Sequence, residues 1–144
     1  MRDSLDDRTK ADHENRTRFL LPRRTHTLVR VDGKSFHRYT RGCDRPFDAD
    51  MTDDMDTAAL ALRESVEGTQ LALVQSDEIS SLVTDFSSPQ AEAWFNGSIQ
   101  KLASLSASLA TTHFNAARGH RAAQGADAPM VYSDSRVFTI PAAW

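Results

Sequence analysis

The spacing of apolar residues divides the chain into strand-like and helix-like segments. From His26 to Val31, polar and apolar residues alternate, as in a half-buried strand, and the turn dipeptide Asp32-Gly33 is expected to end it. Two further apolar runs, at about 70–75 and 78–84, are rich in strand-forming residues, and so is the last segment, 130–140. The pattern therefore predicts four strands.

Between these strands, apolar residues recur every three or four positions, which is typical of the buried face of a helix. One helix is predicted from Asp48 to Gly68, with Met51, Met55, Ala58, Leu62 and Val66 on its inner face. Ser88-Pro89 is typical of a helix start, and a second helix is predicted from about Gln90 to Asn115. Its expected inner residues are Phe95, Ile99, Leu102, Leu105 and Leu109. A linker rich in glycine and alanine, 117–129, follows.

The predicted order is β-α-β-β-α-β, which right-handed crossovers fold into a ferredoxin-like α/β (α+β) arrangement. This arrangement is an antiparallel sheet with two helices on one face. It forms one domain over residues 23–144, behind a polar lead-in over residues 1–22. The third strand then runs antiparallel beside the first, so that Asp32 is expected to lie next to Glu78 at one edge of the sheet.

Composition narrows the class of protein. The chain has 144 residues, enough for one domain with a sizeable core, and no apolar run approaches the ~18 residues of a membrane span. The N-terminus lacks the apolar core of a secretory signal, and Cys43 is the only cysteine, so we expect a cytoplasmic protein. Residues 1–47 hold 12 Lys/Arg against 7 acids, whereas the rest holds 5 against 13. This asymmetry fits an anionic ligand near the basic third, or a solvated surface without a partner.

The turn between the two middle strands carries adjacent acids, Asp77 and Glu78, inside the segment "QSDEIS". Together with Asp32 they would place two or three carboxylates in one small volume, where they repel one another. A divalent cation removes that repulsion, and oxygen ligands suit Mg²⁺ better than zinc. Two such ions can activate an attacking hydroxyl and stabilise a leaving phosphate oxygen. On spacing alone, an ordinary polar hairpin remains an equal interpretation.

Longer motifs resemble the tRNA-histidine guanylyltransferase family, including its guanylyltransferase-like 3′-5′ reverse polymerases. "RVDGKSFHRYT" at 30–40 is followed by "QSDEISSLVTD" at 75–85, and shorter matches are "RPFDADM", "WFNGSIQKLASLSAS" and "DSRVFTIP". They occur in the family's order and cover most of the chain from Arg30 onward. The resemblance implies a polymerase-like palm, in agreement with the ferredoxin-like prediction.

The resemblance also implies an activity: addition of GTP or another nucleotide to the 5′ end of tRNA, after activation of that end with ATP. It implies that Asp32 and Asp77 are catalytic residues that bind two Mg²⁺ ions with the backbone carbonyl of Gly33, and that Glu78 is a third catalytic acid. Nucleotide contacts are implied for Lys34, Phe36, His37, Arg45, Ser76 and Lys101. Asp134, in contrast, is expected to pair with Arg136 in a structural role.

The resemblance stops at the end of the chain. Family members continue past "IPAAW" at 140–144 through a WRQ-type segment, and the eukaryotic type through a HINNLYN-like motif. Because that part helps to hold tRNA and to form the family's homo-oligomers, we expect metal binding to persist while tRNA handling is impaired. Two alternatives therefore stay open: a remnant that only binds nucleotide or tRNA, and another palm enzyme such as a nucleotidyl cyclase. The "QSDEI" turn departs from the GG[DE]EF-type turn of many cyclases.

Overall fold

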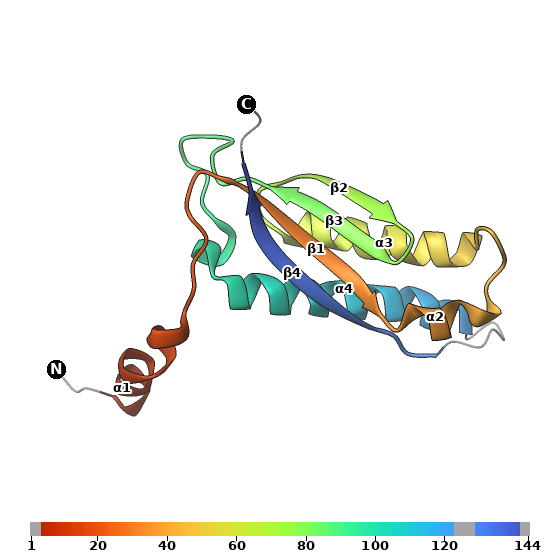
Figure 1. Cartoon of the computed structure of the whole chain (residues 1–144), viewed down its shortest axis with the longest axis horizontal. Helices are drawn as coiled ribbons and strands as arrows, with labels where there is room; N and C mark the ends of the chain where they lie inside the picture. The colour runs from red at the N-terminus through yellow and green to blue at the C-terminus, as the bar shows by residue number, and fades with distance from the viewer. Residues whose placement is uncertain (1–3, 123–128, 142–144) are drawn as a thin grey trace.

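The computed structural model of the chain describes residues 4–122 and 129–141. Four antiparallel strands form one sheet in the order β2-β3-β1-β4, and the helices α3 and α4 cover one of its faces (Figure 1). The elements of this layer are β1 (His26–Lys34), α3 (Ala49–Ser65), β2 (Thr69–Gln75), β3 (Glu78–Val83), α4 (Ile99–Ala122) and β4 (Tyr132–Ile140). The predicted β-α-β-β-α-β palm is confirmed.

The alternation of residues along β1 gives the sheet its two faces. Val29 and Val31 are 1% and 2% exposed and contact the helix side, whereas Arg30 and Asp32 lie on the opposite face, which carries no helix (Figure 1). We call this second face the open face. The core between sheet and helices consists mainly of Val29, Val31, Met55, Ala58, Leu62, Val66, Ile79, Val83, Ala110 and Phe114.

Helix α3 follows the predicted stripe. Its N-cap is Asp48, whose carboxylate accepts a hydrogen bond from the Met51 N–H at 2.8 Å, and Met55 and Leu62 are buried. The helix ends at Ser65, earlier than the predicted Gly68. Gly68 instead has φ +83° in the turn before β2, where an added Cβ would collide with the Thr84 carbonyl oxygen.

The second long helix begins and ends later than predicted. The expected start at Ser88-Pro89 is wrong, because Phe95 and Asn96 have positive φ angles inside the short 3₁₀ turn η3 (Trp94–Gly97) and break any helix there. Helix α4 therefore starts at Ile99 and continues to Ala122, through the first six residues of the predicted linker. The linker positions 123–128 lie outside the described residues. Phe95 and Leu105 are 42% and 36% exposed, not inward as predicted.

The predicted end of the first strand at Asp32-Gly33 is also wrong. Strand β1 continues to Lys34, because the long strand β4 supplies pairing partners for Gly33 and Lys34. The following segment contains the short helix α2 (Phe36–Tyr39) and the 3₁₀ turn η2 (Thr40–Gly42). The buried rings of Phe36 and Tyr39 anchor α2 to the core.

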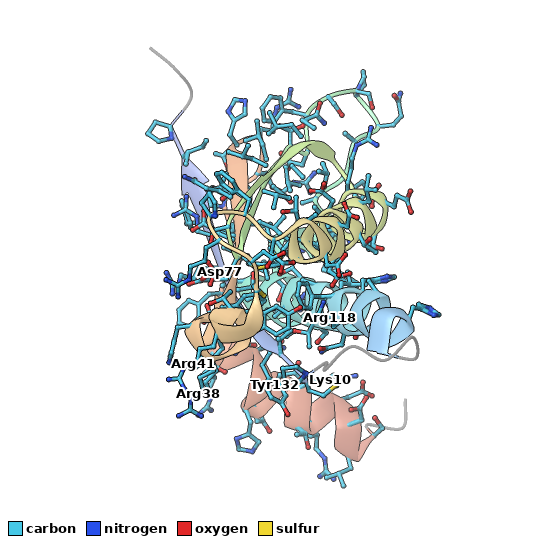
Figure 2. The ribbon with its side chains drawn as sticks, turned by 90° about the vertical axis from the view of Figure 1, so that its right-hand side faces the viewer. Lys10, Arg38, Arg41, Asp77, Arg118 and Tyr132 are labelled. Carbon is cyan, nitrogen blue, oxygen red and sulfur yellow. The ribbon has the colours of Figure 1, made fainter. Side chains whose placement is uncertain are left out.

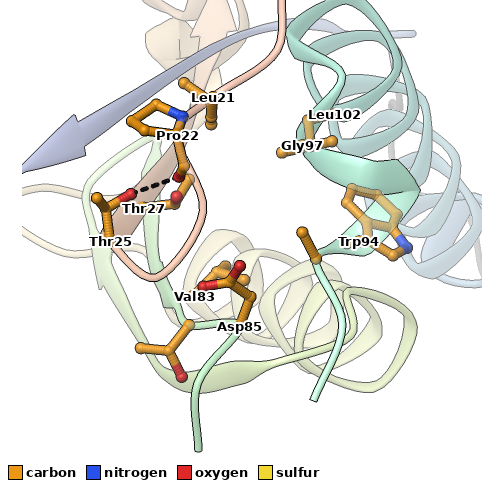
Figure 3. Close-up of a pocket in the computed structure, with 11 residues that line it drawn as sticks. Leu21, Pro22, Thr25, Thr27, Val83, Asp85, Trp94, Gly97 and Leu102 are labelled. Carbon is orange, nitrogen blue, oxygen red and sulfur yellow. Dashed lines mark hydrogen bonds between the residues drawn. The ribbon is translucent and has the colours of Figure 1, made fainter. Parts of the chain in front are cut away.

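The lead-in forms α1 (Leu5–Asp12) and the 3₁₀ turn η1 (Glu14–Thr17), which project away from the sheet (Figure 1). It is tied down where Leu21 donates to the Gly97 carbonyl at 2.9 Å and Ile99 donates to the Phe19 carbonyl at 3.1 Å. Leu21, Gly97 and Asp85 border a cavity of about 30 Å³ there (Figure 3). This cavity lies at the end of the sheet opposite Asp32. In the described part of the chain, no helix has the length and apolar character needed to cross a bilayer.

Candidate active site

Three carboxylates lie side by side on the open face, one on each of three neighbouring strands. Asp32 on β1 is paired in register with Glu78 on β3 and, on its other side, with Asp134 on β4. The strand pairing is continued by the Gly33 N–H, which donates to the Asp77 carbonyl at 3.0 Å. The predicted meeting of Asp32 with the acidic hairpin is confirmed, and Asp134 is an additional neighbour.

The hairpin turn sets the position of Asp77. Ser76 has φ +58°, so that the two residues Ser76 and Asp77 form a tight turn between β2 and β3. Asp77 borders a small cavity of about 10 Å³ together with Phe36 and Phe114. Burial raises the pKa of the Asp32 carboxyl, and the negative charges of Asp77 and Asp134 raise it further. The acids therefore act on one another electrostatically.

Two arginines on the open face offset part of this charge. Arg136 lies 3.7 Å from Asp32 Oδ2 and 3.7 Å from Asp134 Oδ1. Arg30 lies 3.2 Å from Glu78 Oε1, which also accepts a hydrogen bond from the Ser80 hydroxyl at 3.1 Å. The predicted Asp134–Arg136 pair is present, but sequence reasoning missed the contacts of Arg136 with Asp32 and of Arg30 with Glu78. The period of two along β1 and β4 was the signal that could have found them.

The donor set suits a hard cation. Asp32 and Asp77 offer carboxylate oxygens, and the charge of Asp77 acts on Asp32. The Asp32 side chain is 38% exposed, so that water and phosphate oxygens can reach it. Across residues 4–122 and 129–141, no three His, Cys, Asp or Glu side chains form a ready-made metal cluster. Two carboxylates and the Gly33 carbonyl would leave about half of the six positions around an octahedral Mg²⁺ to water or substrate, which is a usual arrangement for that ion.

An open pocket of about 990 Å³ lies beside the hairpin turn. Ser76 and Arg45, both predicted nucleotide contacts, line it together with Cys43 and Phe47. The Phe47 ring is 86% exposed. The pocket is as large as typical sites for drug-sized ligands, and it brings Arg45 and Ser76 together at the acidic end of the sheet.

The remaining predicted contacts are scattered. Lys34 and His37 are exposed on β1 and α2. The Phe36 ring, in contrast, is 5% exposed, and its centroid lies 5.2 Å from that of Tyr39 and 5.4 Å from that of Phe114. Phe36 therefore presents no open ring face. Lys101 lies in the first turn of α4, with its ammonium 5.3 Å from the Phe95 ring centroid. Nine residues, or about 14 Å of helix, separate Lys101 from Ala110 beneath the acids, so Lys101 stands apart from the site.

Comparisons with known proteins agree with this geometry. The family model described as tRNAHis guanylyltransferase (Thg1) matches residues 8–141. Among solved structures, a bacterial tRNA(His) guanylyltransferase-like protein in complex with GTP is 39% identical with a TM-score of 0.88, over 96% of this chain and 64% of that one. A structure of a bacterial tRNA(His) guanylyltransferase-like protein in complex with ATP is 38% identical with a TM-score of 0.87, over 96% of this chain and 60% of that one.

A more distant structure, tRNA(His) guanylyltransferase from Saccharomyces cerevisiae, is 25% identical with a TM-score of 0.76. It is matched over 94% of this chain and 58% of its own length. The comparison with curated proteins gave no match. This chain therefore spans a little under two thirds of the length of each of these three structures.

Proposed function

The chain belongs to the tRNAHis guanylyltransferase family, and from this premise we propose that it is a nucleotidyltransferase that adds GTP or another nucleotide to the 5′ end of a tRNA. The observation that carries the proposal is the register of β1 and β3, which pairs Asp32 with Glu78 on the open face and links Gly33 to Asp77. Family membership also removes the reason to prefer a nucleotidyl cyclase.

In the proposed reaction, an oxygen of the tRNA 5′-monophosphate attacks the α-phosphorus of ATP and releases pyrophosphate. The 3′-hydroxyl of the incoming nucleotide then attacks the 5′-phosphorus, forming a phosphodiester and releasing AMP. If the tRNA starts with a 5′-triphosphate, the first step is not needed and pyrophosphate leaves in the second. In both cases the new linkage grows the RNA in the 3′-to-5′ direction.

Asp32, Asp77 and the Gly33 carbonyl are the residues proposed to hold Mg²⁺, as two ions, with Glu78 beside them. Bound there, the metal supplies the positive charge that favours ionisation of the attacking hydroxyl and stabilises the leaving phosphate oxygen. The Glu78 carboxylate, anchored by Arg30 and Ser80, is held in place to orient the reacting groups or to accept the hydroxyl proton.

The pocket lined by Arg45 and Ser76 is the proposed site of the nucleoside triphosphate, because it opens beside the acids and has the size for such a ligand. The two similar bacterial proteins are in complex with GTP and with ATP, which supports a nucleoside triphosphate as the ligand. Arg45 is suited to a triphosphate oxygen, and the exposed His37 is proposed to meet the nucleotide from the side of α2. The exposed Lys34 is proposed to bind a nucleotide phosphate at the end of β1. Phe36 and Lys101 contribute only if the site rearranges.

The test is incorporation of α-phosphate-labelled GTP, and of each other NTP, into a tRNA that lacks its 5′-terminal nucleotide. We expect incorporation only with Mg²⁺, loss of it with a chelator, and a decrease of about 100-fold or more for Asp77→Asn. Asp12→Asn, which changes an exposed acid on α1, is the control. Equal incorporation by Asp77→Asn and the unaltered chain would reject the proposal.

Two other outcomes identify the alternatives. Tight, saturable tRNA binding without incorporation would mark the chain as a binding remnant, and a cyclic nucleotide formed from NTP alone would mark it as a cyclase. A cytoplasmic location and a homo-oligomeric state belong to the same proposal, and sedimentation of the purified chain measures the latter.

A further inference from the structure

A second hollow, of about 320 Å³, lies at the same end of the sheet as the carboxylates. Its wall combines a basic side chain at the end of β1, Lys34, another on α2, Arg38, and the aromatic ring that starts β4, Tyr132. We call these three residues the β4-start subsite. Figure 2 views this end of the molecule, with Arg38 pointing outward from α2 and Tyr132 below Asp77.

The hollow carries two basic side chains, Lys34 and Arg38. Among the described residues, no carboxylate lies within ion-pair distance of Lys34 or Arg38, in contrast to Arg30 and Arg136 on the neighbouring rows of the sheet. Both side chains are exposed. The hollow is therefore suited to an anionic ligand.

Tyr132 offers a flat apolar surface beside this charge. Its side chain is 66% exposed, although a tyrosine of a sheet usually covers part of the core. Tyr132 is paired in register with Lys34, and it precedes Asp134 by two residues on the same face of β4. Two residues of strand span about 7 Å, so the ring lies one step from the row of carboxylates that contains Asp32.

We propose that the β4-start subsite binds the 5′-terminal nucleotide of the RNA substrate, with its base stacked on Tyr132 and its phosphates near Lys34 and Arg38. An exposed ring flanked by basic side chains on an antiparallel four-stranded sheet is a recurrent means of holding an unpaired RNA base. The inference rests on the proposed function, because it places the RNA end that would react within one step of the acids.

The chemistry favours RNA over a free nucleotide at this position. A nucleoside triphosphate concentrates its charge at one end and already has the larger pocket beside Arg45 and Ser76. The β4-start subsite instead combines two basic side chains, Lys34 and Arg38, with the exposed ring of Tyr132. This layout matches a chain of single phosphates with one base turned onto the ring.

The experiment uses the full chain and an RNA hairpin labelled at its 3′ end that carries one unpaired 5′ nucleotide. A second hairpin is identical except that this nucleotide lacks its base. Binding is measured by fluorescence anisotropy over a series of KCl concentrations, and GTP binding is measured in parallel. We expect the missing base to weaken binding to the unaltered chain about tenfold.

Tyr132→Ala is expected to weaken binding of the intact hairpin by a similar factor and to make the missing base irrelevant, because both changes remove the same stack. Tyr132→Phe should restore the difference between the hairpins. Phe19→Ala, which removes another ring that is 66% exposed but lies in the lead-in, is the matched control. Arg38→Gln should lower the salt slope by about one, whereas Arg63→Gln on α3 should not change it.

Each outcome decides between the two proposals. If the unaltered chain binds the intact hairpin and the missing base or Tyr132→Ala has no effect, this inference is overturned while the proposed function stands. The same holds if Tyr132→Ala weakens binding of GTP but not of RNA. If the unaltered chain binds no RNA, the proposed function and the inference fail together. The hairpin without a base tests the stack even if a Tyr132 variant does not fold.

Discussion

Gly33 lies in the candidate site, and the Phe36 ring packed beside it leaves no room for a side chain at this position. A Cβ added to Gly33 would lie 2.8 Å from Cγ of the Phe36 ring and closer still to Cδ2 and Cε2. Carbon atoms in ordinary contact are about 3.5–4.0 Å apart. The change Gly33→Ala therefore requires the ring to move by more than 1 Å.

The ring has little room to move. Phe36 is 5% exposed and is held between Tyr39 and Phe114, whose ring centroids are 5.2 and 5.4 Å away. Overpacking a core in this way costs about 1–3 kcal/mol, and we expect a value near the upper end because the ring is enclosed by other rings. The free energy of unfolding should fall by that amount, measured as a shift in the urea midpoint at constant slope.

Two variants separate this explanation from a general effect of alanine. Gly119→Ala in α4, where an added Cβ meets nothing within 4 Å, should raise the free energy of unfolding by about 0.5–1 kcal/mol. In a Phe36→Leu background the cost of Gly33→Ala should shrink by about 1 kcal/mol or more, because the colliding ring is absent. Equal urea midpoints for Gly33→Ala and the unaltered chain would refute the reasoning.

Three further predictions concern the contacts of Asp85 and Asn115 and the reactivity of Cys43 in the large pocket. Burial alone would raise the pKa of Asp85, but hydrogen bonds from the Arg23 side chain and the Arg24 N–H hold it below the ordinary value of 3.8. Asp85→Asn should therefore lower the free energy of unfolding by about 1–2 kcal/mol at neutral pH. In acid denaturation, the difference in this free energy between the variant and the unaltered chain should vanish as the pH falls through the lowered pKa. A difference that stays constant with pH would contradict this. Asn115 donates to the Val131 carbonyl and accepts from its N–H, each at 3.0 Å. Asn115→Ala should therefore lower the free energy of unfolding in urea by roughly 2 kcal/mol. Asn115→Asp should cost at least as much at neutral pH, because its carboxylate has no N–H for the Val131 carbonyl and sets a charged oxygen against it. Unchanged urea midpoints would be inconsistent with these bonds. Burial and the nearby Asp48 carboxylate raise the pKa of the Cys43 thiol. The reaction of Cys43 with a disulfide reagent at pH 8 should therefore be slower in the folded chain than in the urea-unfolded chain, and slower again when GTP fills the pocket. Equal rates in the folded and unfolded chains would contradict the burial.

The features that could be predicted from the sequence are those set by period and order. The alternation around Val29 and Val31 specifies which face of β1 is buried, and the β-α-β-β-α-β order then leaves one compact topology, which brings Asp32 to Glu78. The stripe from Met55 to Leu62 fixed α3 in the same way. These signals act over many residues, so a local exception does not overturn them.

The errors arose where one tertiary contact outweighed a local signal. Asp32-Gly33 is a turn dipeptide, but pairing with β4 extends the strand through it. Ser88-Pro89 is a helix-start signal, yet the positive φ angles of Phe95 and Asn96 delay the helix to Ile99. Nothing in the local sequence indicates that the backbone of Gly97 must meet Leu21 from the lead-in, a contact that fixes this turn.

The arrangement of charge on the open face explains how carboxylates can be held together before any ligand binds. Arg136 stands 3.7 Å from Asp32 and Asp134, but its side chain is 63% exposed. Such solvated ion pairs contribute about 0–1 kcal/mol. They therefore reduce repulsion between the acids, yet an arriving cation or phosphate can replace them at small cost. The strand register, rather than the arginines, is what keeps the acids in one row, so the site retains its geometry when its ionic partners change.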